Sequence, residues 1–407
     1  MAKLQFFNLF GNSGTYLSPE QINRILILAF GISQSKSVNI SYVNDVILLS
    51  ESGCKNEDSQ YNWLLKLFQT GNYDNIIRNS FHLLVVYFYG GQSHVKLVLD
   101  RTNWDLGTEK INILTIGLLT ENQIFIPLIW EDLGHRGNSH SFIRIALIDR
   151  LLTWWKALNI PLPTFEICGD REFIGEYWLT ELARRDIYYV IRLRCDLSFE
   201  TWLNGEYKID KRFTLPCLHR YMRLCKKESV EVVLQNEAIA QVFIVENEGN
   251  DAKQEPFIYF ITNLDNLDQA ALDYRKRWKI EVFFKYMKTQ GFNLEAFNMS
   301  GQHKANILMA VLSIVFLMVL ELDDQNQKKE EEQEEQGEIV PKNAQKLNTY
   351  KNGKSYPRKS NFRMGRTAIS KIRCVEMFIE VWEHIIQKIL FKLQFLNQLY
   401  INKIYAQ

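Results

Sequence analysis

The sequence contains few cysteines, and their spacing is not that of a metal site or a disulfide framework. Only six cysteines occur in 407 residues, and no two of them form a C-x-x-C pair. We therefore expect neither structural zinc nor disulfide bonds, and a reducing cytosol suits the chain. The first residues, MAKLQFFNLFGNSG, also lack the basic segment, apolar stretch and cleavage site of a signal peptide.

The chain has no excess of charge of either sign. Its 48 basic and 47 acidic residues give a formal net charge of +1. This balance provides no general attraction to nucleic acid, so a DNA-binding surface has to come from local clustering of charge. A hydrophobic share of 46% is ample for a sizeable core and excludes global disorder. The length suits about two or three domains.

A hydrophobic run long enough to cross a membrane is missing as well. The most apolar segment, residues 305–320, has sixteen uncharged residues, fewer than the ~20 that a spanning helix needs. We predict a buried core helix here and no membrane contact. A membrane-associated protein is an alternative that rests on this segment alone.

Residues 1–90 are predicted to form a helical N-terminal region. Ser18, with Pro19 next and Gln21 three residues on, resembles a capping box before an apolar run. The region has six basic and six acidic side chains, so its charge does not announce a DNA-binding domain. Helical modules nevertheless read DNA with few residues, and DNA binding by this region stays open.

From residue 94 the pattern changes to alternating strands and helices. Three strands are expected in HVKLVLD, INILTIGLLT and QIFIPLIWED, followed by a helix, a strand, a second helix and a strand. The order βββαβαβ is that of a ribonuclease-H-like domain, in which helices flank a mixed sheet. We therefore predict an α/β fold, with the catalytic domain in residues 91–196 and 257–322.

Other segments interrupt or follow this domain. Residues 197–256 offer β-rich runs between polar turns and are predicted to form an inserted sheet. Residues 323–338 carry eight acidic and two basic side chains, whereas residues 341–366 carry eight basic and none acidic. We predict a charged flexible linker over 323–366. A helical segment for docking or dimer contact is expected over 367–407.

Two aspartates follow apolar strands of the predicted sheet. Asp100 closes LVLD and Asp170 closes EICGD, and functional residues in such sheets sit at strand ends. Each aspartate taken alone is explained more simply as the start of a turn. Together they outline a Mg²⁺ site, because this ion takes hard oxygen ligands and commonly uses few protein carboxylates.

Glu281 is the candidate third carboxylate. We predict a long helix from about residue 268 to 290, on which Tyr274, Arg277, Glu281 and Lys288 fall within roughly 60°. Ile280, Phe283, Phe284 and Met287 lie on a broadly opposite arc. One face then packs while the other meets substrate. The simpler alternative is an amphipathic helix with a solvated charged face.

The spacing Y-x2-R-x3-E-x6-K at these four positions is the signature of IS4-type bacterial insertion-sequence transposases, and the chain resembles this family. LVLDRTNW resembles the family's first-Asp motif and CGDREF its second. The similarity runs from about residue 90 to 320 and includes a β-rich insertion where the family carries one. It implies that Asp100, Asp170 and Glu281 are the catalytic triad of a DDE transposase and bind two Mg²⁺ ions, with Mn²⁺ as a substitute.

The same resemblance implies the substrate and the roles of the basic residues. Arg277 and Lys288 would neutralise DNA phosphates, and Tyr274 would hydrogen-bond to the backbone or stack near it. The partners would be double-stranded DNA, both transposon terminal inverted repeats and target, and a second copy of the chain on DNA. The site of action would be the bacterial cytosol, at the nucleoid. Trp202 or Tyr221 could stack a flipped base, but no motif selects either.

Two other functions fit the sequence. An inactive or repurposed transposase-like DNA-binding protein would keep all three carboxylates, whereas a non-transposing nuclease of the same fold would cleave DNA without joining 3′-ends. His135 and His140 share the polar loop GHRGNSH, but further ligands for zinc are not evident there. Arg171 could touch phosphate or simply orient the adjacent Asp170.

Overall fold

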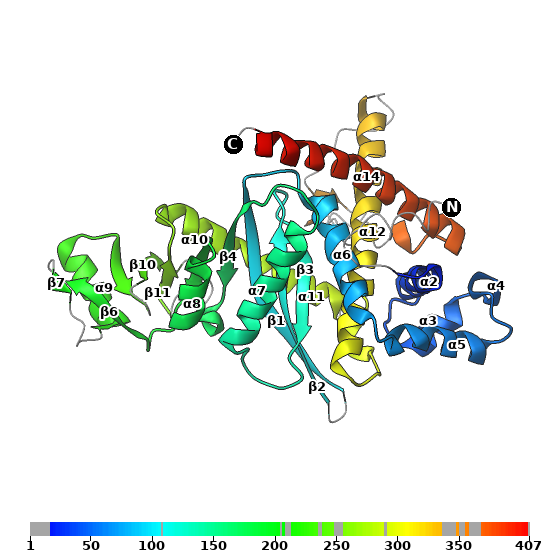
Figure 1. Cartoon of the computed structure of the whole chain (residues 1–407), viewed down its shortest axis with the longest axis horizontal. Helices are drawn as coiled ribbons and strands as arrows, with labels where there is room; N and C mark the ends of the chain where they lie inside the picture. Colours follow the sequence, from blue (N-terminus) through cyan, green and yellow to red (C-terminus); the bar gives the residue numbers. More distant parts are fainter. Residues whose placement is uncertain are drawn as a thin grey trace. The chain divides into compact units, whose positions relative to one another are not determined.

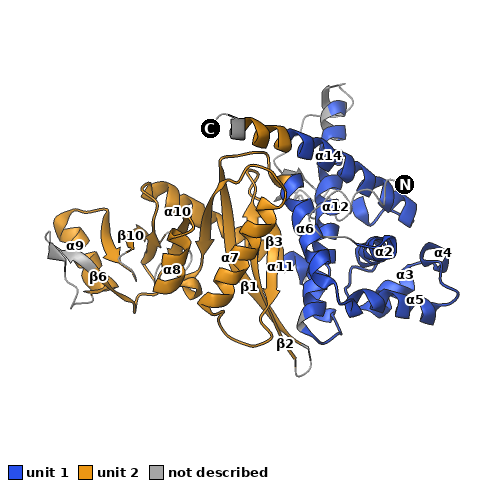
Figure 2. Ribbon diagram, viewed as in Figure 1, with its two compact units in different colours: residues 1–87, 285–395 blue, residues 88–284, 396–407 orange. Residues whose placement is uncertain are grey.

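The chain forms two compact units, shown in different colours in Figure 2. The first contains residues 1–87 and 285–395, and the second contains residues 88–284 and 396–407. The computed structural model describes residues 17–106, 109–203, 206–207, 213–234, 238–247, 255–288, 291–335, 347–349, 355–357 and 368–405.

The first unit is built mainly from helices. They are α2 (Pro19–Ser35), α3 (Ile40–Val46), α4 (Leu49–Ser52), α5 (Glu57–Leu65), η2 (Lys66–Gln69), α6 (Tyr73–Phe88), η5 (Leu294–Ala296), α12 (Gln302–Glu335) and α14 (Val375–Tyr405), of which the residues from 396 onward are assigned to the second unit. The predicted capping box is confirmed, since the Ser18 hydroxyl accepts from the Gln21 backbone N–H and the Gln21 side chain accepts from the Ser18 N–H. The helical N-terminal region is confirmed from Pro19 to Phe88, while residues 1–16 of the predicted region lie outside the described residues.

Helix α12 contains the apolar segment that the sequence singled out. The segment His303–Lys329 is long and apolar enough to cross a membrane, but 94% of its most apolar window is buried inside the structure, which is typical of a core helix. The helix then continues to Glu335, so the predicted flexible linker was wrong for residues 323–335. Charge pairing one turn apart supports this extension, as Asp324 lies 3.0 Å from Lys328.

The rest of the predicted linker lies largely outside the described residues. Within it the structure describes one short hairpin, formed by β12 (Leu347–Thr349) and β13 (Ser355–Pro357).

The second unit is built on a single mixed sheet. Its strands are β1 (His94–Leu106), β2 (Glu109–Leu119), β3 (Phe125–Asp132), β4 (Thr164–Gly169), β5 (Ile187–Arg192), β6 (Ser198–Leu203), β7 (Glu206–Tyr207), β8 (Phe213–Thr214), β9 (Ser229–Val233), β10 (Ile239–Glu246) and β11 (Phe257–Thr262). Their order is β3-β2-β1-β4-β5-β11-β10-β9-β6-β7, with β8 paired to β6. Strands β1, β4 and β5 are parallel, and the other pairs are antiparallel. The α/β class is confirmed.

The inserted strands continue this sheet instead of forming a separate one. Strand β11 pairs with β5 on one side and with β10 on the other, so the hydrogen bonding continues from the central strands into β9 and β6. Figure 1 labels β11, β10 and β6 of this continuation. A helix that the sequence did not predict, α9 (Leu215–Cys225), lies within the insertion. The segment around α9 is rich in basic residues, and its amphipathic helical pattern was not recognised in the sequence.

Helices cover both faces of the sheet. Helices α7 (Ser141–Lys156) and α8 (Glu176–Ala183) pack against each other, and on this face Trp155 of α7 meets Phe165 of β4 with ring centroids 5.2 Å apart. Helix α10 (Leu267–Lys276) packs on the opposite face, where Cys168, Phe260 and Tyr274 share one buried cluster. Residues 165 and 168 point to opposite faces because strand side chains alternate.

Candidate acidic site

The pairing of β1 with β4 places two aspartates side by side. The parallel register runs from His94 and Thr164 to Leu99 and Gly169, and Asp100 and Asp170 are the next residue of each strand segment. Strand β1 does not end at Asp100, as the sequence suggested, but continues to Leu106 along β2. What ends at Leu99 is its pairing with β4, so both aspartates lie where the parallel pair opens.

The backbone after β4 holds Asp170 in place. Asp170 caps the short helix η3 (Arg171–Phe173), and its carboxylate accepts a hydrogen bond from the Arg171 N–H at 2.8 Å. Glycine at position 169 lets the chain pass close to its neighbours, because a Cβ atom there would lie 2.9 Å from the Ile191 side chain and 3.3 Å from Phe173. The Arg171 side chain itself is exposed.

Helix α10 is anchored to the same two strands. Buried Asp273 accepts hydrogen bonds from Lys96 of β1 and from Lys276, the latter at 2.9 Å. Tyr274 packs edge-on against Phe260, with ring centroids 4.7 Å apart, and its hydroxyl donates to Asp170 at 3.2 Å. The chain then breaks at Arg277 before α11 (Trp278–Met287) begins. The predicted single helix is therefore two helices.

Arg277 brings the third carboxylate to the two aspartates. Its Nη1 atom donates to Asp100 at 2.8 Å, and its Nη2 atom donates to Glu281 at 2.8 Å. The same Nη2 atom lies 3.9 Å from the carboxylate of Asp170. One guanidinium thus contacts three carboxylates from β1, from the end of β4 and from α11. We call Asp100, Asp170, Glu281 and Arg277 the acidic site.

The other face of α11 is packed, as the sequence predicted. Ile280, Phe283, Phe284 and Met287 are all buried, and Phe283 lies 5.2 Å from the Phe125 ring of β3. This packing fixes the rotation of α11 and hence the direction of Glu281. The alternative of a freely solvated charged face does not describe Arg277, whose side chain is only 10% exposed.

The acidic site combines partial burial with an excess of negative groups. The side chains of Asp100, Asp170 and Glu281 are 16%, 31% and 34% exposed, so solvent reaches all three. Burial raises the pKa of Asp100 to about 6, although the Arg277 guanidinium and the Arg101 N–H act in the opposite direction. One arginine faces three acids, so the site attracts further cations.

The remaining predicted contact residues lie in different settings. Tyr274 is buried beneath Asp170, whereas Lys288 follows α11, belongs to the first unit and pairs with Glu295 at 3.1 Å. The Lys227 ammonium lies 5.4 Å from the Tyr221 ring centre on α9. The side chain of Trp202 lies outside the described residues.

Glu172 helps to position the acidic site, although the sequence did not predict this role. Glu172 pairs with Arg101 through both carboxylate oxygens, at 2.7 and 2.8 Å, and its backbone carbonyl accepts from Arg144 at 3.1 Å. These contacts tie η3, which follows Asp170, to β1 and α7. Glu172 stands within CGDREF, but no spacing rule identified its partners.

The donor chemistry of the acidic site fits a divalent cation, but its present spacing does not. Three carboxylates supply the hard oxygen atoms that Mg²⁺ prefers. Among the described residues, however, no three acidic, histidine or cysteine side chains are arranged to hold one ion. The Arg277 guanidinium lies among these carboxylates. His135 and His140, whose ring centroids are 6.1 Å apart, likewise belong to no such group of three among the described residues.

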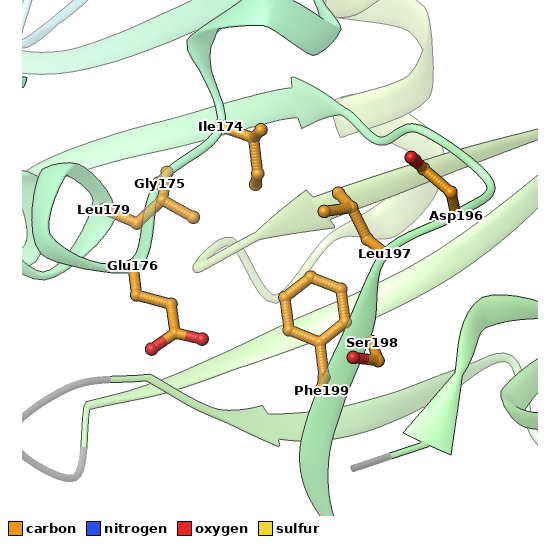
Figure 3. Close-up of a pocket in the computed structure, with 8 residues that line it drawn as sticks. All are labelled: Ile174, Gly175, Glu176, Leu179, Asp196, Leu197, Ser198 and Phe199. Atoms are coloured by element: carbon orange, nitrogen blue, oxygen red, sulfur yellow. The ribbon is translucent and has the colours of Figure 1, made fainter. Parts of the chain in front are cut away.

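A cavity of about 270 Å³ lies beside the segment that follows Asp170 (Figure 3). Residues 174–176 and Leu179 line one side, and residues 196–199, which open the insertion, line the other. Figure 3 shows the Phe199 ring, Leu197 and the Glu176 carboxylate around it. None of the four acidic-site residues lines this cavity.

The topology and the acidic site define the class of this protein. A β3-β2-β1-β4-β5 sheet with helices on both faces, and acids where β1 and β4 part, is a ribonuclease-H-like α/β domain. Residues 146–318 match the family model described as "Transposase DDE domain". This match supports a DDE transposase, a class that uses divalent metal ions and acts on DNA. It includes Asp170 and Glu281, while Asp100 precedes it. No curated protein matches the chain.

Proposed function

We propose that the chain is a cut-and-paste transposase that cleaves DNA at transposon ends and joins the freed 3′-ends to target DNA. The observation that carries the proposal is the contact of one guanidinium with carboxylates from three elements. Acids far apart in the sequence gather in this way at a partly exposed edge of the sheet. The match to a transposase DDE domain supports DNA as the substrate class.

Asp100, Asp170 and Glu281 are the residues that would hold Mg²⁺ or Mn²⁺. Two ions bound there would activate a water or 3′-hydroxyl for in-line attack and stabilise the leaving oxygen. The protein's own contribution is to hold these three carboxylates in position. Strands β1 and β4 fix the two aspartates, α11 fixes Glu281, and burial of Phe283 and its neighbours keeps α11 from rotating.

Basic and aromatic residues complete the proposed site. We assign Arg277 and Lys288 to phosphate contacts, and we assign to Tyr274 a hydrogen bond that orients Asp170. The Y-x2-R-x3-E-x6-K spacing, typical of IS4-type enzymes, supports these roles. We further propose the bacterial nucleoid as the place of action, inverted repeats and target as the DNA, and a homodimer on DNA because two ends have to be paired.

The test is metal-dependent cutting of DNA that carries the cognate terminal repeats. Glu281→Gln should fold and bind DNA but lose at least ~100-fold in cleavage rate, because the metal site loses a charged ligand. Glu131→Gln is the matched control, since Glu131 lies in the same unit and pairs with Arg150. Equal cleavage by wild type and Glu281→Gln would reject the assignment.

The same assay separates the alternatives. A repurposed DNA-binding protein binds the repeats but does not nick them in Mg²⁺. A non-transposing nuclease nicks them but yields no strand-transfer product. The proposal requires both nicking and joining.

A further inference from the structure

Arg277 lies where a metal-loaded site would need free carboxylate oxygens. Its two terminal nitrogens donate to Asp100 and Glu281, both at 2.8 Å, and one of them lies 3.9 Å from Asp170. A carboxylate oxygen engaged by a guanidinium is not equally available to a hard cation. The side chain is 10% exposed, so water does little to loosen these contacts.

The surroundings of Arg277 leave one hydrogen-bond donor of its guanidinium group without a partner. Its buried Nε atom has no hydrogen-bond partner among the described residues. The buried Nε atoms of Arg24, Arg78 and Arg192 also lack a partner there, so the direction of the two terminal nitrogens, and not this donor, distinguishes Arg277. The Tyr274 ring, 5.6 Å from the guanidinium carbon, lies beside it and leaves the two terminal nitrogens directed at the acids.

We infer that Arg277 is an internal cation that closes the acidic site in the DNA-free protein, and that divalent ions and Arg277 compete for the same three carboxylates. Movement of the guanidinium from the carboxylates to a DNA phosphate would open the site. Arginine suits both partners, because its planar fork matches carboxylate and phosphate alike. Metal affinity and DNA affinity are then linked, and each ligand strengthens the other.

This linkage has a functional consequence. A site that takes up metal mainly with DNA in place does not carry activated water in the free protein, which protects DNA from cutting before the complex is assembled. The inference rests on the proposed function for its DNA partner, but its metal half concerns the DNA-free protein alone.

The experiment measures Mn²⁺ binding to the full chain by electron paramagnetic resonance, without any cleavage step. In the absence of DNA, Arg277→Gln should bind Mn²⁺ at least ~10-fold more tightly than wild type, because the competing cation is gone. Arg192→Gln is the control for simple loss of a nearby charge. Arg192 is close enough to Asp170 to feel its charge, but its ion pair is with Glu255 at 2.6 Å.

A short DNA duplex of arbitrary sequence, at low salt, provides the second measurement. Adding the duplex should tighten Mn²⁺ binding to wild type at least ~5-fold more than it does for Arg277→Gln. Binding of Mn²⁺ to the duplex alone is subtracted. Comparing the two proteins removes any contribution in which the DNA itself serves as a metal ligand.

The outcomes distinguish this inference from the proposed function. Equal Mn²⁺ affinity of wild type and Arg277→Gln, or an equal gain in Arg192→Gln, overturns the inference. If the tight binding in Arg277→Gln survives the added change Glu281→Gln, the proposed metal site itself is wrong. Should Arg277→Gln fail to fold, Arg277→Lys serves instead, because its single ammonium cannot replace the fork and intermediate Mn²⁺ affinity is expected.

Discussion

Two groups of charged side chains in this protein use the same chemistry for different ends. In the acidic site, one arginine faces three carboxylates that are 16% to 34% exposed. In the first unit, Glu321 of α12 is fully buried and is contacted by Tyr87, His384 and Lys388, with Lys388 2.8 Å from both oxygens. We call these four residues the Glu321 cluster.

The two groups differ in the balance of positive and negative charge and in the access of solvent to the carboxylates. The acid of the Glu321 cluster is matched by a cation from α14 and by a hydroxyl from α6, with no water-facing carboxylate oxygen left over. The acidic site has two acids more than cations, and solvent reaches all three of its acids. Balanced buried charge fixes the packing of helices, whereas unbalanced, accessible charge is available for a ligand.

The largest effect should come from the acidic site, on activity and not on folding. Asp170→Asn should lower the rate of metal-dependent DNA cleavage by at least ~100-fold, because one ligand charge is lost. Its thermal unfolding temperature should stay the same or rise, since removing one of three crowded acids relieves repulsion. A large fall in unfolding temperature would place Asp170 with the structural acids.

The opposite result is expected in the Glu321 cluster. Lys388→Met should destabilise the first unit by about 3 kcal/mol, because it leaves a buried carboxylate without its cation. Urea unfolding followed by tryptophan fluorescence measures this loss. Lys371→Met is the control, because Lys371 is an exposed lysine of the same unit. A loss of unfolding free energy smaller than that of the control would show that the pair of Lys388 and Glu321 does not stabilise the first unit.

The Glu321 cluster should also make stability depend on acid pH. Burial alone would raise the pKa of Glu321, but hydrogen bonds from Lys388, Tyr87 and Gln325 outweigh it and lower the pKa below its ordinary value of 4.5. The stabilisation is therefore present above pH 4.5 and is lost as the pH falls through the lowered pKa. Urea unfolding between neutral and acidic pH should show this loss in wild type and a smaller one in Glu321→Gln.

Much of the fold was predictable because it depends on local patterns. Apolar runs and their alternation identified β1 to β5 and α7, and Asp100 and Asp170 could be paired because parallel strands open at a common edge. The salt bridges of Arg277 depend on side-chain directions set by tertiary packing, which spacing along one helix does not define. The four-residue signature could suggest phosphate contacts but not this arrangement.

The first unit shows the other limit of the sequence. Glu321 stands between an apolar run and an acidic segment, at the end of the predicted catalytic segment 257–322, and no role was predicted for it. Its cation, Lys388, is 67 residues away on α14, and no local pattern joins the two. The strands of the insertion were visible in the sequence, but their continuation of the main sheet depends on β11 pairing with β5.

The smallest effect is expected at Lys288, which pairs with the exposed acid Glu295. Lys288→Ala should weaken DNA binding modestly and reduce the slope of log affinity against log salt by about 1, because one phosphate contact disappears. Titrating a labelled duplex at several salt concentrations measures the slope. An unchanged slope would assign Lys288 to its ion pair alone.

The most direct test of the central claim is to locate Mn²⁺ by anomalous scattering in crystals of the full chain bound to transposon-end DNA. We expect manganese ions bound directly to carboxylate oxygens of Asp100, Asp170 and Glu281, with the Arg277 guanidinium turned to a phosphate. Manganese bound elsewhere, while Arg277 still contacts all three acids, would contradict this claim.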